Sequence, residues 1–499
     1  MTTTIIRGGR VLDVAGHRAE PADVLVDGAV IREIGRPGMA APEGASVLDA
    51  RDRLLIPGLV NAHTHSHGAL TRGLPGDRVP LEILLTTGGA LNANRTVEDK
   101  RLAAQLAAIE MVRKGCTAAY DMFVELPAPT VDGVHAAARG YADVGMRAVV
   151  APMMADRTFY RALPGLLDAL PEPLRGQAEA MQTAPSETSL AACREIVRGW
   201  PLDRALVRPG LGPTIPMHCS DEFITSCRDF ARDLDLGVQM HLGESRGQAV
   251  LGRKKYGKTL TAHLRDLGLL GPRFSGAHGV WLDADDVKML ADAGSSVAHN
   301  PTSNLRLGSG VAATRMMLDG GLGVGVGTDS PASSDTQNMF EAMRWASYLS
   351  RVSTLDYRRW ITAEEAFTMA TAGSARVLGM DGHIGRLAPG YRADIVLLDL
   401  SRPDFVPLND VLLQLVFSEA GAAVDTVMID GRVVLDRGRI VTVDEQKVRA
   451  AAEAAAARLR EANATALAAA RAFEPHVGAF CIGLAREPYH IARVLSPDA

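Results

Sequence analysis

The chain has 499 residues, of which 47% are hydrophobic and 22% charged, and its formal net charge is −5. This length exceeds that of a usual single domain and leaves room for a large α/β barrel plus an accessory domain. The charge balance provides no basic footprint for nucleic acid, and no uncharged apolar run reaches the ~18 residues of a membrane span. Five scattered cysteines without CxxC spacing and the lack of a signal-peptide core predict a cytoplasmic protein.

The first part of the chain, residues 1–57, has the pattern of a small β-module. Short β-rich runs at 3–6, 24–26 and 30–34 are separated by glycine and proline turn signals. From residue 58 to 384 the pattern changes to short apolar runs alternating with longer helical stretches, which predicts parallel strands joined by crossover helices. The clearest helical stretches are 97–114, 131–144, 221–234, 284–293 and 363–377.

The pattern returns to β-strands at 385–445, where Asp430-Gly431 predicts a hairpin turn. The simplest account is one β-domain made from residues 1–57 and 385–445, with a barrel formed by 58–384 inserted between them. An alanine-rich helix is expected within residues 446–499, followed by a tail that the sequence does not define.

A pair of histidines two residues apart follows the first predicted barrel strand. Strand side chains alternate between faces, so His63 and His65 point the same way and can bind one metal ion. The alternative is a pair of polar residues that merely closes a strand. The choice depends on whether other segments supply further ligands.

Three further strand-like runs also end in residues that bind metal or transfer protons. The first ends in His241 with Glu244 three residues on, the second in His278, and the third in Asp329. Each alone could be a hydrogen-bonded histidine, a surface glutamate or a helix-capping aspartate. Active sites of α/β barrels lie at the carboxyl ends of their strands, so the coincidence of these strand ends predicts a metal site.

The remaining histidines are weaker candidates. We expect structural or surface positions for His67 and His135, among others. His299 begins a run rich in hydrogen-bonding groups that extends to Asn304, and it can line the site. His218 lies near another predicted strand end and is a lesser candidate for facing the substrate.

With these motifs assembled, the chain resembles the amidohydrolase superfamily. Within it, the likeness is to the branch of S-adenosylhomocysteine/methylthioadenosine deaminases and chlorotriazine hydrolases. It covers nearly the whole chain, and the motifs in order are PGLVNAHTH, LTRGLPGD, IEMVRKGCTAAYDM, HLGES, AHGVWL, HNPTSNLRLGSG, GTDSPASSD, GRLAPGYRADIVLLDL and VMIDGRVVL. The resemblance implies a (β/α)8 TIM barrel with a β-sandwich-like domain formed by both chain termini.

The resemblance also implies one divalent metal ion, zinc first and iron as the alternative, bound by His63, His65, His241 and Asp329. Some superfamily members hold two metals bridged by a carboxylated lysine on the fourth strand. No lysine occurs between Lys114 and Lys254, which span that strand, so one metal is expected. The alternative that a glutamate bridges two metal ions stays open.

The roles implied for the other motif residues are catalytic. Glu244 would move protons between the attacking water and the leaving nitrogen. His278 would hydrogen-bond the water or the developing tetrahedral centre, and Asp329 would accept a proton besides binding the metal. The expected function is that of a mononuclear metal-dependent aminohydrolase (deaminase) acting through a metal-activated water on a small, nitrogen-containing heteroaromatic molecule.

Two departures from the adenosine-deaminating relatives bear on the substrate. They carry a tryptophan and a histidine where this chain has Ile83 and Thr214, which disfavours an adenosyl substrate. Glu82 could hydrogen-bond a ribose-like diol, and Ser330 replaces a glycine beside the metal aspartate. The expected substrate-binding residues are therefore Glu82, Thr214, His299, Asn304 and Ser330.

The alternative function is hydrolysis of an amide, urea, carbamate or chlorotriazine-like substrate with the same machinery. A non-catalytic homologue with a structural metal is disfavoured, because such a metal needs neither Glu244 nor His278. The expected partner is a small-molecule substrate, with no nucleic acid and no membrane, and we expect a homo-oligomer.

Overall fold

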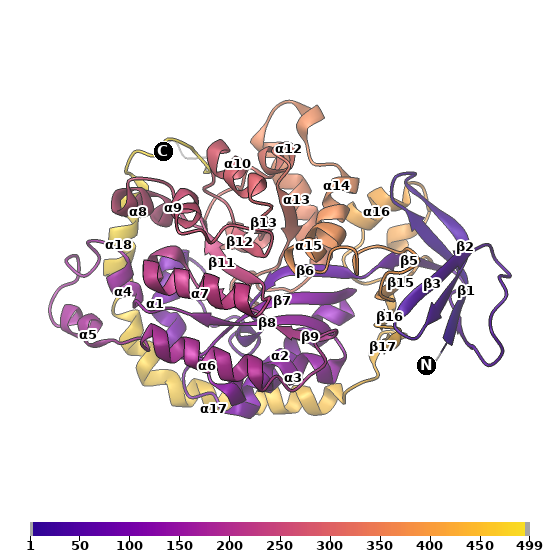
Figure 1. The fold of residues 1–499 in the computed structure, drawn as a ribbon, viewed down its shortest axis with the longest axis horizontal. Coiled ribbons are helices and arrows are strands. Elements are labelled where there is room, and N and C mark those ends of the chain that lie inside the picture. Colours follow the sequence, from indigo (N-terminus) through magenta and orange to yellow (C-terminus); the bar gives the residue numbers. More distant parts are fainter. Residues whose placement is uncertain (1–2, 495–499) are drawn as a thin grey trace.

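Both ends of the chain contribute to one mixed β-sheet in the computed structural model, which describes residues 3–494. Figure 1 shows this sheet at one end of the molecule, where indigo N-terminal strands lie near orange C-terminal ones. The shared β-structure that the sequence predicts is therefore present. In hydrogen-bonded order the strands are β18 (Arg439–Ile440), β17 (Arg432–Asp436), β16 (Val424–Ile429), β15 (Ile395–Asp399), β5 (Arg53–Pro57), β1 (Thr3–Asp13), β2 (Arg18–Asp27) and β3 (Val30–Gly35), with β4 (Ser46–Asp49) beside β1.

The turn between β16 and β17 is the predicted hairpin. Asp430 and Gly431 both have positive φ, 55° and 76°, as a two-residue type I′ turn requires. A side chain at Gly431 would also collide with the backbone oxygen of Gly28, so only glycine fits there.

The central strands are all parallel and form a TIM-barrel-like α/β fold. They belong to two hydrogen-bonded sheets, which isolated parallel bridges connect at Leu211–Val238 and Thr64–Asp329. The strands in chain order are β6 (Leu59–Thr64), β7 (Cys116–Val124), β8 (Arg147–Met154), β9 (Val207–Pro209), β10 (Gly212–Pro213), β11 (Val238–Leu242), β12 (Phe274–His278), β13 (Ser296–His299) and β14 (Gly323–Val326).

Helices surround these strands (Figure 1). Four of the predicted helices are found within one residue of their expected bounds, namely α2 (Val97–Arg113), α3 (Val131–Val144), α7 (Asp221–Asp233) and α10 (Ala284–Asp292). The helix predicted at 363–377 is instead α14 (Ala363–Thr368), a π-helical turn at Met369–Gly373, and α15 (Ser374–Val377). The widened turn brings Gly373 against the backbone of Val324 in β14, where a side chain would clash.

Two helices follow the terminal sheet in sequence and return to the barrel. Figure 1 shows α17 (Glu445–Arg471) running beneath the barrel toward α18 (Glu474–Ala485). Asn463 of α17 is buried and bonds the loop after α1 (Leu81–Asn92): it accepts from Asn94 Nδ2 at 2.8 Å and donates to the Ala93 oxygen at 3.1 Å. These contacts hold the end of α17 close to α1.

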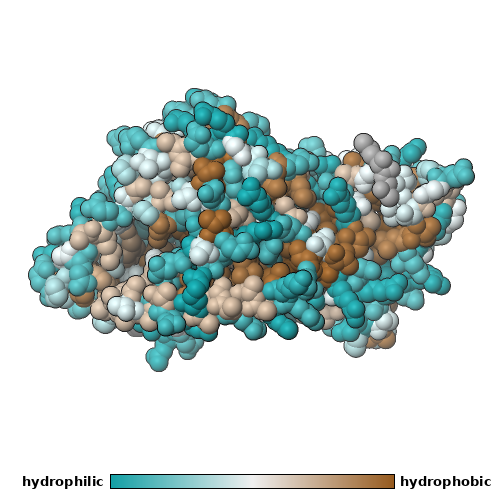
Figure 2. Space-filling model, turned by 90° about the horizontal axis from the view of Figure 1, so that it is seen from below, coloured by the Kyte–Doolittle hydropathy of each residue, from teal (hydrophilic) through white to brown (hydrophobic). Residues whose placement is uncertain are grey.

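The face shown in Figure 2 is largely hydrophilic at its edges, with a band of hydrophobic residues across its middle. Among residues 3–494, no helix combines the length and the apolar character needed to cross a bilayer.

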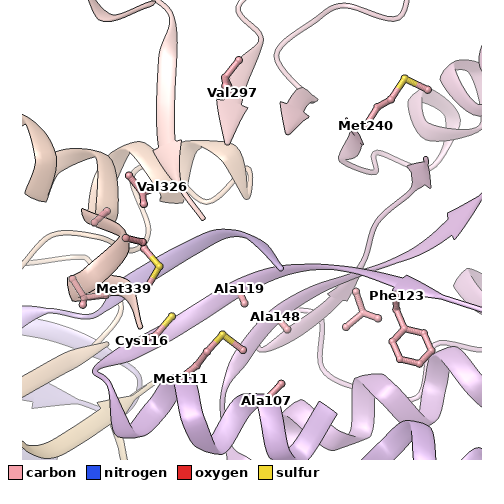
Figure 3. Close-up of a cluster of buried hydrophobic side chains, with 14 of the residues drawn as sticks. Ala107, Met111, Cys116, Ala119, Phe123, Ala148, Met240, Val297, Val326 and Met339 are labelled. Atoms are coloured by element: carbon pink, nitrogen blue, oxygen red, sulfur yellow. The ribbon is translucent and has the colours of Figure 1, made fainter. Parts of the chain in front are cut away.

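The main core lies between the strands and the outer helices, and Figure 3 shows part of it. Ala119 and Phe123 of β7 pack in this layer with Met111 of α2, all at most 1% exposed. Tyr120 and Met122 of the same strand belong instead to the cluster inside the barrel. This alternation follows the two-residue period of a strand and leaves the strand ends free to carry polar groups.

Candidate active site and metal centre

The histidines and the aspartate singled out by the sequence meet at the carboxyl ends of the parallel strands. His63 lies in β6, with His65 just after that strand, His241 lies in β11, and Asp329 follows β14. Ligand atoms of His63, His65 and His241 all lie within 4.8 Å of one another, and those of His63, His278 and Asp329 do as well. All these residues are buried.

The three histidines of the first group share one hydrogen-bonding pattern. Each ring places Nδ1 2.6–2.7 Å from an oxygen that can only accept, so Nδ1 carries the proton and Nε2 keeps its lone pair. The acceptors are the side-chain oxygen of Gln239 for His63 and the backbone oxygens of Met122 and Thr214 for His65 and His241 respectively.

The resulting arrangement of lone pairs fits a cation. His65 Nε2 and His241 Nε2 are only 3.2 Å apart, and His63 Nε2 is buried with no partner among the described residues. Asp329 Oδ1 lies 3.5 Å from His63 Nε2 and 3.3 Å from His65 Nε2. Burial lowers the pKa of His65 to about 4, and the neighbouring His63 ring adds to this shift. Neutral imidazoles facing one carboxylate are a donor set that suits zinc.

Asp329 is held by both backbone and side-chain contacts. Its φ is +62°, and its N–H donates to the His63 oxygen at 2.9 Å, where the bridge joins β6. Ser303 and Ser333 donate to Oδ2 at 2.5 and 3.0 Å. Burial alone would raise the pKa of Asp329, but the adjacent His63 ring, followed by His65 and His278, holds that pKa well below its usual value. The group therefore stays an anion.

Glu244 and His278 form a second pair beside the ligands. Glu244 Oε1 lies 3.6 Å from His278 Nε2, and Glu244 Oε2 is buried without a described partner. Burial, followed by the negative charges of Asp329 and Glu82, raises the pKa of Glu244 well above its ordinary value. His278 places Nδ1 2.9 Å from Asn304 Oδ1, and burial lowers its pKa to about 3. The pair thus presents a protonated acid and a neutral base.

A cavity of about 740 Å³ opens onto these groups. Its wall contains His65, His241, Glu244 and Asp329, together with mainly apolar side chains. Among the latter are Leu84 of α1, Met153 of β8, Phe159 of the helix after β8, and, at the end of α17 and just beyond it, Ala466, Ala470 and Phe473. A flat apolar ring can therefore be enclosed next to the candidate metal ligands.

The predicted substrate-binding residues divide into two groups. Thr214 and Ser330 line the cavity. Glu82, His299 and Asn304 lie outside its wall: Glu82 accepts from Ser245 Oγ at 2.5 Å, and Asn304 holds His278. His299 is buried with both ring nitrogens unpartnered among the described residues. The roles assigned to these five residues remain predictions.

Sequence reasoning missed several parts of the wall. His67, expected to be structural or at the surface, lines the cavity next to His65, and Arg157 lines it too. His218, a lesser candidate from the sequence, is also part of the wall. The continued two-residue spacing from His63 through His65 to His67 is a signal that could have pointed to His67. No comparable local signal marks Arg157 or the end of α17.

The fold and the site together define a metal-dependent hydrolase that acts on carbon–nitrogen bonds. Residues 54–434 match the sequence model of the amidohydrolase family, and the chain belongs to that family.

Its relatives include named deaminases. A 5-methylthioadenosine/S-adenosylhomocysteine deaminase of Syntrophomonas wolfei is 33% identical over 90% of this chain and 97% of its own length. A 5′-deoxyadenosine deaminase of Methanothermobacter thermautotrophicus is 35% identical, with 91% and 98% covered.

Solved structures share the fold over almost the same extent. An adenosine deaminase from Xanthomonas campestris with bound zinc has a TM-score of 0.81 and 28% identity, covering 92% of this chain and 99% of that one. Atrazine chlorohydrolase from Arthrobacter aurescens, complexed with zinc, has a TM-score of 0.80 and 26% identity, covering 91% and 100%.

Proposed function

We propose that this protein is a mononuclear metal-dependent aminohydrolase that removes an amino group from a small heteroaromatic substrate and releases ammonia. The observation that carries the proposal is the presence of two arrangements at one cavity: four metal-binding side chains and the buried pair Glu244–His278. A structural metal has no use for a proton-transfer pair.

The substrate class is a cyclic amidine, in which the amino-bearing carbon adjoins a ring nitrogen. Relatives named for adenosine derivatives support this class, and so does the largely apolar cavity. Adenosine, 5′-deoxyadenosine and 5′-methylthioadenosine are therefore the first compounds to test.

His63, His65, His241 and Asp329 would hold one divalent ion, zinc in the first place and iron as the alternative. When bound, such an ion supplies a Lewis acid that lowers the pKa of water toward about 7. The fourth-strand residues Val207–Pro209 include no lysine that could bridge a second ion.

The chain's own residues move the protons. Glu244, kept protonated by its surroundings, donates to the ring nitrogen next to the amino carbon and makes that carbon electrophilic. Asp329, kept ionised, accepts the proton that the attacking water loses. His278 Nε2 accepts a hydrogen bond from that water, because Nδ1 already donates to Asn304. Glu244, now ionised, takes the second proton of the attacking water and carries it to the leaving nitrogen as ammonia departs. The proton held by Asp329 then restores the acid form of Glu244.

Replacing the acid tests this scheme. Glu244→Gln keeps the size of the side chain but cannot donate the proton, so we expect kcat to fall by about 10²–10⁴-fold. Metal analysis should still find one zinc per chain, since Glu244 is not in the ligand set. Glu222→Gln, at an exposed position of α7, is the matched control. Unchanged turnover in Glu244→Gln would refute the acid, and two zinc ions per chain would refute the mononuclear site.

The second candidate is hydrolysis of a chlorotriazine, amide, urea or carbamate. One observation favours it: Ile83 lies close to Gly478 of α18, so no aromatic ring stacks on the substrate from that position. The structural match to atrazine chlorohydrolase supports it as well. Assays of zinc-loaded protein with aminopurines, triazines and aryl ureas separate the two, because ammonia, chloride, amine and carbon dioxide are different products.

The proposal extends to the architecture. The bridges at Leu211–Val238 and Thr64–Asp329 support a closed (β/α)8 barrel from 58–384. An apolar cluster shared by N- and C-terminal strands supports a sandwich-like domain from 1–57 and 385–445, with 446–499 as a separate helical segment.

Two further features complete the proposal. The hydrophobic band in Figure 2 and the exposed Val352, Leu355 and Tyr357 support a homo-oligomer, which size-exclusion chromatography with light scattering would test. The five cysteines, none in a disulfide, support a cytoplasmic location.

A further inference from the structure

His67 occupies a distinct position in the cavity wall. Its ring lies beside that of His65, with centroids 5.4 Å apart, and meets the edge of Phe123 at 6.0 Å. The residue is 9% exposed and lines the cavity. It belongs to the short helix Ser66–Leu70, which begins directly after the metal-binding segment.

The hydrogen bonding of His67 is the reverse of that in the metal-binding histidines. The backbone N–H of Val124 donates to His67 Nδ1 at 3.4 Å, so this nitrogen is the acceptor and the proton of the neutral ring sits on Nε2. His63 and His65 instead donate from Nδ1 and keep a lone pair on Nε2. His67 therefore presents an N–H donor, which cannot bind a cation.

Hydrogen bonds hold the His67 ring in place, but its Nε2–H donor has no acceptor among residues 3–494. Arg95 Nη1 donates to the His67 backbone oxygen at 2.6 Å, which anchors the backbone of this segment. Among residues 3–494, no group accepts a hydrogen bond from His67 Nε2, and this nitrogen is not among the atoms enclosed by protein. A positioned donor that opens into a cavity is suited to a ligand.

We propose that His67 is a substrate-binding residue that donates a hydrogen bond from Nε2 to an acceptor atom of the heteroaromatic ring. The inference rests on the proposed aminohydrolase function and narrows its substrate. Because the His67 ring lies next to that of His65, the acceptor belongs to the same heterocycle as the reacting carbon. The substrate is thus a ring with a nitrogen or carbonyl acceptor in addition to the nitrogen that Glu244 protonates.

Three variants of zinc-loaded protein test the donor. In His67→Gln the amide nitrogen reaches the position of Nε2, whereas in His67→Asn it stays near the position of Nδ1, and His67→Phe keeps only the ring packing on Phe123. On the aminated heterocycle that the wild type deaminates best, we expect kcat/KM about tenfold lower for the Asn and Phe variants. The Gln variant should recover most of this loss. His135→Asn, which alters a buried histidine outside the cavity, should keep the wild-type value.

Two readouts separate a binding role from other roles. Zinc content should stay at one equivalent in all three variants, and a loss of zinc would overturn the proposal by making His67 a ligand. For a purine substrate, the 3-deaza and 7-deaza analogues remove one acceptor each. With the wild type, one of the two analogues should have a lower kcat/KM than its parent purine. With His67→Phe, that analogue and its parent should have equal kcat/KM.

The outcomes also distinguish this inference from the function on which it rests. If the wild type deaminates a heterocycle but Asn and Phe variants keep its kcat/KM, only the role of His67 is wrong. The role of His67 is also wrong if, for each deaza analogue, kcat/KM falls relative to the parent purine by the same factor in the wild type and in His67→Phe. If the wild type releases no ammonia from any aminopurine, pterin or aminotriazine, the proposed function fails, and the inference fails with it.

Discussion

Glu244 and Asp329 are carboxyl groups buried in the same site, yet their surroundings shift their pKa values in opposite directions. Burial, followed by the negative charges of Asp329 and Glu82, raises the pKa of Glu244 and keeps its proton. Asp329 accepts from two serines and faces the histidines, which keep it ionised. One acid and one base are thereby available at the same pH, as general acid–base catalysis requires.

Gln239 is the residue on which the orientation of His63 depends. Its side chain accepts from His63 Nδ1 at 2.7 Å and donates to the Ala62 oxygen and to Ser275. We expect Gln239→Leu to weaken zinc binding by about 10–100-fold, because the His63 ring loses its fixed tautomer and direction. Competition with a chromophoric chelator measures this affinity. Ser275→Ala, which leaves the His63 contact in place, is the control, and equal zinc affinity in Gln239→Leu would contradict the prediction.

At the scale of elements, capping residues set the bounds of the barrel helices. Asp283 and Asp286 form a capping box at the start of α10, and Asp286 also accepts from Thr259 Oγ1 at 2.5 Å, the residue that caps α9 (Leu260–Asp266). Burial raises the pKa of Asp286 to about 6, from an ordinary value of 3.8. Two neighbouring helices thus share one buried titratable group.

This pKa shift predicts how the stability of the α9–α10 region depends on pH. The folded state keeps the Asp286 proton up to about pH 6, whereas the unfolded chain loses it near pH 4. The contribution of this group to the free energy of unfolding is full below pH 4. This contribution falls by up to about 3 kcal/mol as the pH rises from about 4 to about 6. Asp286→Asn removes this titration, so its stability relative to the wild type should improve between pH 4.5 and pH 7.

Urea unfolding at the two pH values measures this difference. Asp285→Asn, at the exposed neighbouring position, controls for the loss of one surface charge. If Asp286→Asn and wild type respond to pH in parallel, the buried carboxyl does not titrate as described.

At the scale of the whole molecule, one buried arginine joins the barrel strands to the terminal sheet. Arg147, at the start of β8, is 1% exposed. It pairs with Asp394 through two hydrogen bonds of 3.0 Å each, and with Asp430 of the hairpin turn at 3.0 Å. The terminal sheet is therefore joined to the barrel-like strands by a buried, bidentate ion pair at the strand ends opposite the site.

Breaking this pair should destabilise the protein strongly. Arg147→Met leaves Asp394 buried without its cation, and we expect a loss of about 3–5 kcal/mol in the free energy of unfolding. The double variant Arg147→Met/Asp394→Leu should recover much of the loss, because no unpaired charge remains. Arg51→Met disrupts the exposed pair with Asp49 and should leave the free energy of unfolding nearly unchanged. Chemical denaturation compares all three, and similar losses for Arg51→Met and Arg147→Met would contradict the argument.

The candidate site residues could be predicted to lie together because each is at the end of a strand. His63 and His65 share a face through the period of a strand, and His241, His278 and Asp329 follow apolar runs of strand length. The helices predicted by amphipathic runs are found for the same reason. The exception at 363–377 arises from a tertiary contact of Gly373 with β14, which a helical periodicity does not encode.

The sequence by itself determined the class of fold, the candidate ligand set and the family, because these depend on spacing within single elements and on their order. Only the tertiary structure decided what forms the cavity wall. Glu82 does not line the cavity, because its carboxylate accepts a hydrogen bond from Ser245, 163 residues away in the sequence. The end of α17 and the side chain of His67 do line it. The physical reason is that a wall is made by packing between distant segments, and hydrogen bonds such as that from Val124 to His67 exist only once those segments meet.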